Sequence, residues 1–291
     1  MREVDLDTLR KTREQVQKAQ PVNREKSRLT YRSSLMLKRY GPAVLLLILL
    51  LAGWQLYTVV SGIRATVLPG PWRVLEALVN FWDVIYDNLL YTLYETVVGF
   101  GVALVAGFAF AMLLDSSSVL RRAVYPLLVA SQTIPLVAIA PLLIIWFGYD
   151  IVPKILVVWL VCFFPIVVAG VDGFASTDPE ITRLFKSMNA TRWQIFWKLR
   201  LPSALPFLFS GIRIAITYSV AGAILGEYVG AEKGLGIFIQ RSKNSFRNDL
   251  IFAAVLVTAV VSVLLFVLVS VIQHRVMPWY FKMREKKEEI Q

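Results

Sequence analysis

Residues 250–273 read LIFAAVLVTAVVSVLLFVLVSVIQ, a run without a single charged side chain. A helix needs about 20 consecutive, mostly apolar residues to cross the hydrocarbon core of a bilayer. Buried helices of soluble proteins normally keep one polar face and are rarely apolar over such a length. This stretch therefore predicts a transmembrane helix.

Similar runs occur along the rest of the chain, of which 57% of the 291 residues are hydrophobic. They cover Gly41–Ile63, Thr96–Leu114, Ala123–Tyr149 and Ile155–Val171, and a sixth, around Leu205–Gly226, is interrupted only by Arg213. A soluble fold has no use for six such segments. We expect an all-α, polytopic integral membrane protein with about six transmembrane helices.

The runs divide the chain into five regions. We expect a cytoplasmic basic tail (1–40), a first transmembrane helix (41–63), an outer segment (64–95), a core of five transmembrane helices with a long loop at 177–202 (96–273), and a cytoplasmic tail (274–291). The outer segment contains Leu68-Pro69-Gly70-Pro71, a turn that starts a predicted helix over about Pro71–Asn88. Apolar residues recur in that helix every three or four positions, so it is expected to lie on the membrane surface.

The net charge of +11 has a topological explanation. Eleven Lys and Arg precede Tyr40, two follow span 2, five lie in the loop 172–204 and five follow the last span, which makes 23, against seven in the alternate loops. Cytoplasmic loops collect Lys and Arg, so both termini are predicted to be cytoplasmic. No nucleic-acid partner is expected, because no soluble domain carries the charge.

Residues for catalysis or metal binding are scarce. The single cysteine, Cys162, lies inside span 4, and the single histidine, His274, lies at the inner end of span 6. No nucleophile–base pair or metal-ligand cluster can be placed at one depth, which disfavours a membrane enzyme. We expect no catalytic residue and no metal. An ion-coupled secondary transporter remains the alternative, although few titratable groups lie away from the helix ends.

Two regions are candidates for a translocation path. Span 3 combines Pro126, Pro135 and Pro141 with Ser131, and its candidate path residues are Gln132, Thr133 and Pro135. Proline frees backbone carbonyls at membrane depth, which is tolerated next to protein or a wet cavity; a packing kink is the alternative. Glu227, near the outer end of span 5, is a third candidate, unless it pairs with Lys233 at the headgroups.

The loop 177–202 carries two helix signals. Thr177 and Glu180 have capping-box spacing, and the helix Glu180–Met188 should stop at Asn189 in the left-handed conformation. Thr191 and Gln194 form a second capping box, which starts a short helix with Trp193, Phe196 and Trp197 that should end before Leu201-Pro202 and Leu205-Pro206. Exposed aromatic residues beside cations suit docking into a partner's groove; contact with the membrane interface is the alternative.

At this loop the sequence resembles a known family. Arg183–Pro202 is similar to the cytoplasmic loop signature of permease subunits of binding-protein-dependent ABC importers, with Arg183-Leu184-Phe185 in place of Glu-Ala-Ala and Asn189 in place of Gly. Further family landmarks follow in order over residues 65–280. They are Leu68-Pro69-Gly70-Pro71, Ile134-Pro135-Leu136, Trp146-Phe147-Gly148, Asn189–Gln194, Gly226–Gly230 and Gly234-Leu235-Gly236.

The resemblance implies a type-1 ABC importer permease fold in a bacterial cytoplasmic membrane. It implies a homodimer of permeases, a separate ABC ATPase bound through a coupling loop with Arg183, Asn189, Trp193, Trp197 and Pro202, and an extracytoplasmic substrate-binding protein. ATP and Mg²⁺ would be held by the ATPase, so no cofactor is expected on this chain, which contains no Gly-x4-Gly-Lys-[Ser/Thr] phosphate loop. The most similar branch serves sulfonates, taurine, nitrate, and thiamine-precursor pyrimidines or riboflavin.

Overall fold

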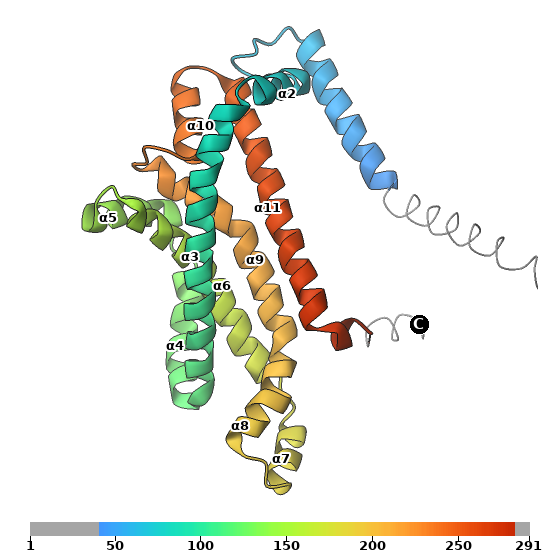
Figure 1. The fold of residues 1–291 in the computed structure, drawn as a ribbon, viewed down its shortest axis with the longest axis vertical. Coiled ribbons are helices and arrows are strands. Elements are labelled where there is room, and N and C mark those ends of the chain that lie inside the picture. Colours follow the sequence, from blue (N-terminus) through green and yellow to red (C-terminus); the bar gives the residue numbers. More distant parts are fainter. Residues whose placement is uncertain (1–40, 283–291) are drawn as a thin grey trace, which may run out of the picture. The chain divides into compact units, whose positions relative to one another are not determined.

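The computed structural model describes residues 41–282, and every regular element in that part is helical (Figure 1). Backbone contacts divide the chain into two compact units, Met1–Ile63 and Arg64–Gln291. The described part of the first unit is a single helix, Gly41–Val60, which is long and apolar enough to span a membrane. The predicted tails 1–40 and, except for its start, 274–291 lie outside the described residues.

The second unit contains the remaining helices. They are α2 (Pro71–Asn80), α3 (Trp82–Ser116), α4 (Ser118–Ser131), α5 (Leu136–Phe147), α6 (Ile151–Ala175), α7 (Pro179–Ser187), α8 (Arg192–Ile195), a π-helical turn (Phe196–Arg200), α9 (Leu201–Tyr228), α10 (Leu235–Asn244) and α11 (Asn248–Val276). Together with Gly41–Val60 of the first unit, five segments of the described residues are long and apolar enough to cross a membrane, and the bent pair α4–α5 makes up to six. The all-α, polytopic prediction is confirmed.

Helices α3, α6 and α9 form the centre of the second unit, and α11 packs along α9 (Figure 1). Glycine lets their backbones approach closely. A Cβ added to Gly99 of α3 would lie 2.6 Å from Cβ of Val158 in α6, and one added to Gly211 of α9 would lie 2.4 Å from Cβ of Ala169. In α3 the close approach to α6 thus requires glycine at position 99, whereas Gly101 faces open space.

The predicted surface helix is too long. It ends at Asn80, because Phe81 leaves the helical conformation (φ −116°, ψ 20°), and α3 begins at Trp82. Residues 82–95, predicted to belong to the outer segment, therefore form the first turns of α3. The polar side chains of these residues suggested a solvated segment, but several of them form hydrogen bonds or ion pairs inside the bundle, as described below.

The predicted third span is divided into two helices. Helices α4 and α5 meet at 99°, with the bend at Gln132–Pro135. The chain leaves α4 through short-range hydrogen bonds, from Thr133 N to Ala130 O (3.1 Å) and from Ile134 N to Ser131 O (3.2 Å). Pro135 has no N–H to continue the ladder. Pro135 therefore lies at the break in this span, whereas Pro126 and Pro141 stay inside helices.

The predicted helix end at Leu201-Pro202 is also wrong. Helix α8, the π-helical turn and α9 follow one another without a break. The turn is wide enough for Leu201 N to donate to Phe196 O. Pro202 follows directly on this π-helical turn, at the start of α9. The short loop helix is thus a continuous extension of a membrane-spanning helix.

Candidate functional site

The loop 177–202 is built by helix caps. Asp178 Oδ1 accepts the N–H of Glu180 at 2.7 Å and starts α7, so Asp178, not the predicted Thr177, is the capping residue. Asn189 adopts φ 58°, and Ala190 N donates to Phe185 O at 3.0 Å, which confirms the predicted left-handed stop. The Thr191–Gln194 capping box is also confirmed: Gln194 N donates to Thr191 Oγ1, and Thr191 N donates to Gln194 Oε1.

An aromatic group covers the short helix. The rings of Trp193, Phe196 and Trp197 contact one another with centroids 5.4–6.1 Å apart. Phe196 also reaches Phe174 of α6, at 5.9 Å, and Ile195 is buried. Trp193 remains 68% exposed. The helix is therefore anchored on one face and presents tryptophan on the other.

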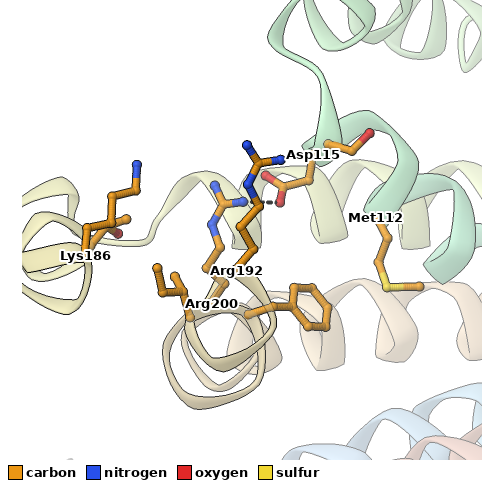
Figure 2. A pocket seen from close by; sticks show the side chains of 9 residues that line it. Met112, Asp115, Lys186, Arg192 and Arg200 are labelled. Carbon is orange, nitrogen blue, oxygen red and sulfur yellow. Dashed lines mark hydrogen bonds and ion pairs between the residues drawn. The ribbon is translucent and has the colours of Figure 1, made fainter. Parts of the chain in front are cut away.

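An ion pair ties the loop to the end of α3. Arg200 Nη1 lies 2.6 Å from Asp115 Oδ2. The two residues line a cavity of about 540 Å³ together with Lys186 and Arg192 (Figure 2). Figure 2 shows the guanidinium groups of Arg192 and Arg200 near Asp115, with Lys186 farther away on α7. Neither Asp115 nor this pairing was predicted from the sequence.

The other predicted loop residues lie at its surface. Arg183, on α7, and Asn189 are exposed, whereas Pro202 is half-buried. The path candidates lie far along the chain, at the α4–α5 bend. Gln132, Thr133 and Pro135 are all exposed, and the Thr133 hydroxyl donates to Ala130 O at 2.7 Å. These two groups of residues lie on different elements and form separate candidate sites.

Glu227 is fully buried at the end of the bundle opposite the loop 177–202. Its Oε1 accepts the Thr92 hydroxyl at 2.6 Å, and its Oε2 accepts the backbone N–H of Gly236. Thr92 Oγ1 also accepts Leu235 N at 2.8 Å. Glu227 and Thr92 thus fasten the start of α10 to α3 and α9.

The connection between α9 and α10 requires glycine at position 234 for steric reasons. Gly234 has φ +124°, and a Cβ there would lie 2.3 Å from Cδ of Glu227.

The alternative that Glu227 forms an ion pair with Lys233 at the headgroups is wrong. Lys233 Nζ instead donates to the hydroxyl of Tyr91 at 3.2 Å, and this hydrogen bond raises the pKa of the Lys233 ammonium group.

A second buried pair lies beside Glu227. Lys154 Nζ of α6 is 3.9 Å from Glu95 Oε1 of α3, and both side chains are almost entirely buried. Glu227 interacts electrostatically with both residues. The sequence reasoning missed Glu95 and Lys154, although each directly precedes a predicted span, at Thr96 and Ile155. A charge at the very edge of an apolar run was the available signal.

Neither a catalytic pair nor a metal centre emerges from the part of the chain that the structure describes. Within residues 41–282, no group of three or more His, Cys, Asp and Glu side chains could hold a metal ion. Cys162 is buried, and its thiol donates to Ala215 O at 3.4 Å. The fold is that of a helical membrane protein with an aromatic loop outside its spans.

Comparison with known proteins identifies the family within that class. Residues 102–282 match the family model described as the binding-protein-dependent transport system inner membrane component, and the chain belongs to this family. The chain is 35% identical over 236 residues to the formylaminopyrimidine transport permease protein ThiX of Halalkalibacterium halodurans, covering 81% of this chain and 94% of that protein. It is therefore a permease subunit of an ABC importer and a multi-pass protein of the inner membrane.

Other relatives have different named solutes. The riboflavin transport system permease protein RibX of Chloroflexus aurantiacus is 34% identical, covering 80% of this chain and 88% of that protein. The taurine transport system permease protein TauC of Escherichia coli is 28% identical, with the same coverages. Among solved structures, an inward-facing MetNI methionine ABC transporter chain is similar with a TM-score of 0.58 at 21% identity, covering 68% of this chain and 98% of that chain. That similarity confirms the type-1 permease fold.

Proposed function

We propose that this chain is one of two identical permease subunits that import a small polar solute across a bacterial cytoplasmic membrane. A separate ABC ATPase docks on the loop 177–202, and an extracytoplasmic binding protein delivers the solute to the opposite end. The observation that supports this most is the exposed Trp193 on a helix that continues directly into the membrane-spanning α9.

The continuity of α8 and α9 supplies a mechanism. A flexible connection would absorb a displacement of the docked helix, whereas an unbroken helix passes it on to the span. The Asp115–Arg200 ion pair carries the same displacement to α3. ATP-driven closure of the ATPases thereby moves α9 and α3 together. In this proposal Trp193 and Trp197 fill the ATPase groove, and Arg183, Asn189 and Pro202 border it.

The solute path is proposed to pass the α4–α5 bend. Gln132 and Thr133 are exposed there beside Pro135, and no charged residue lies between Ser131 and Phe147. Neutral hydrogen-bonding groups suit an uncharged heterocycle better than an anion, which would call for a cation. We therefore favour a vitamin precursor, such as a pyrimidine or riboflavin, over a sulfonate or nitrate. The identities to ThiX and RibX support the same choice.

Glu227 is proposed to have a supporting role in place of a path-lining one. Its side chain is fully buried, and both carboxylate oxygens are engaged with Thr92 and Gly236. It fixes the α9–α10 connection at the end where the binding protein is proposed to dock. The path then depends on Glu227 only through the position of that connection.

The decisive experiment is Trp193→Ala in the assembled importer. We expect the variant to insert normally but to co-purify poorly with the ATPase, and ATP-dependent uptake into proteoliposomes to fall at least about tenfold, because interface tryptophans are frequent hot spots. For co-purification with the ATPase, Trp146→Ala is the matched control, since Trp146 is 67% exposed on α5, away from the loop. Normal complex yield with Trp193→Ala would refute the docking role. Uptake driven by an ion gradient without ATP would favour the secondary transporter.

A further inference from the structure

A second cavity lies between α9 and the end of α11, on the half of the bundle that carries the loop 177–202. Its volume is about 260 Å³, and its walls include Ser210 and Arg213 of α9 and Gln273 of α11. After α11 the chain turns at Met277, which is fully buried, and brings Tyr280 and Phe281 over the cavity. The Phe281 ring stacks on His274 with centroids 3.8 Å apart. The wall of the cavity is therefore held by packing contacts between the end of α11 and the residues that follow it.

Two polar groups in the cavity, an amide oxygen and a cation, have no matching partner among the described residues 41–282. Gln273 is only 3% exposed, yet its Oε1 accepts no hydrogen bond from the described residues. Arg213 has no carboxylate within ion-pair distance in the described part of the chain. Native proteins satisfy nearly all buried polar atoms. A free cation beside an unsatisfied acceptor therefore indicates a ligand with an anionic group and a hydrogen-bond donor.

The cavity lies at the level of lipid headgroups. The charge-free run of α11 ends at Gln273, and the next residues are His274 and Arg275. Trp279 and Tyr280 follow, and such residues are enriched at membrane interfaces. Neither 205–217 nor 270–282 contains an acidic residue. Basic pockets between spanning helices at this depth are suited to anionic lipid headgroups.

We propose that this cavity binds the headgroup of an anionic glycerophospholipid from the leaflet at the loop end of the bundle. Arg213 donates to the lipid phosphate, and a headgroup hydroxyl, as in phosphatidylglycerol, donates to Gln273 Oε1. The acyl chains lie along the exposed apolar side chains of α11, such as Leu268 and Ile272. The bound lipid packs against α9, the span that continues into the loop helix. This site goes beyond the proposed function and depends neither on the solute nor on the energy source.

Lipid binding can be measured by native mass spectrometry of the full-length permease, extracted together with its partner ATPase. The complex is titrated with phosphatidylglycerol, phosphatidylmethanol (a phosphate without a headgroup hydroxyl) and phosphatidylcholine. We expect phosphatidylglycerol to bind at least about tenfold more tightly than phosphatidylcholine, and Arg213→Gln to remove that difference, because charge-assisted bonds to phosphate are the strong ones. Arg275→Gln, a nearby cation outside the cavity, should bind like the wild type.

Gln273→Leu tests the second contact. It should lower phosphatidylglycerol affinity to that of phosphatidylmethanol and leave phosphatidylmethanol unchanged. Equal phosphatidylglycerol binding by wild type and Arg213→Gln would overturn the proposal. Displacement of the lipid by millimolar inorganic phosphate would also overturn it, because that result would indicate a soluble ligand. Lipid binding only after removal of residues 283–291 would overturn it too, because that result would assign the cavity to the chain's own C-terminal residues. If Arg213→Gln fails to assemble, Arg213→Lys, which keeps the charge, and Gln273→Leu decide the outcome.

Discussion

At the scale of single residues, one helix end in the loop 177–202 was predicted correctly from the local sequence pattern and one helix start was not. Asn189 was predicted to end α7, and its φ of 58° agrees, because asparagine tolerates the left-handed region better than other non-glycine residues. The start of α7 was misplaced by one residue. Thr177 and Asp178 are both competent caps, and the choice between them depends on where the preceding helix α6 ends, at Ala175.

The Asp115–Arg200 ion pair gives a residue-scale prediction. Asp115→Asn leaves the shape but removes the charge opposite Arg200, which lies 2.6 Å away in a half-buried position. We expect a loss of about 1–2 kcal/mol of stability, as for a partly shielded charged hydrogen bond. The solute imported per ATP hydrolysed should also fall, because the loop is no longer tied to α3. Parallel assays of uptake and ATP hydrolysis in proteoliposomes measure this ratio.

Asp83→Asn is the control for that variant. It makes the same substitution on the same helix, α3, at an exposed position outside the loop 177–202 and without an ion-pair partner among the described residues. Its ratio of uptake to hydrolysis should equal that of the wild type. An Asp115→Asn importer with an unchanged ratio would show that the ion pair does not take part in coupling.

At the scale of elements, the surprises are the places where proline did and did not break a helix. Pro135 stands at a 99° bend, whereas Pro202 lies in the first turn of α9, just after a π-helical turn. Each proline removes one N–H, but the consequence depends on whether the preceding turn can be widened or the chain must leave the helix. Which of the two happens depends on tertiary packing around the proline. The sequence indicated a kink or a path in the third span, where Pro135 lies at the bend, but it wrongly predicted a helix end at Leu201-Pro202.

Packing of α3 against α6 gives an element-scale prediction. A Cβ at Gly99 would lie 2.6 Å from Cβ of Val158 and 3.0 Å from Ile155 O, whereas a Cβ at Gly101 meets nothing within 4 Å. We expect Gly99→Ala to destabilise the protein by about 1–3 kcal/mol through overpacking. Gly101→Ala should be neutral or stabilise it by up to about 1 kcal/mol, because alanine favours the helix.

Thermal unfolding of the two variants in the same detergent compares them directly. They lie two positions apart on one helix, so differences in insertion or helix propensity largely cancel. A melting temperature of Gly99→Ala equal to that of Gly101→Ala would contradict the close α3–α6 contact.

At the scale of the whole molecule, the distribution of basic residues predicts which end faces the cytoplasm. The native chain has one cysteine, Cys162, and it is buried, so an introduced cysteine can be labelled selectively. Met188, in the loop 177–202, and Tyr149, between α5 and α6, are both 73% exposed. In intact cells an impermeant maleimide should label Tyr149→Cys and should label Met188→Cys only after lysis.

The matched exposure of the two positions makes each the control for the other. A reporter fused after Gln291 should read as cytoplasmic by the same reasoning. Labelling of Met188→Cys in intact cells would invert the proposed orientation and place the ATPase contact elsewhere.

The sequence by itself determined the class of protein, the end of α7 at Asn189 and the capping box of α8. Both depend on local properties: the length of charge-free runs and hydrogen bonds between residues three or four apart. Only the tertiary structure decided that Glu227 bonds to Thr92, 135 positions away, and that Glu95 faces Lys154. The partner of a buried polar group is set by the depth and rotation of the neighbouring helices. Those quantities arise from packing the whole bundle, and no short stretch of sequence contains them.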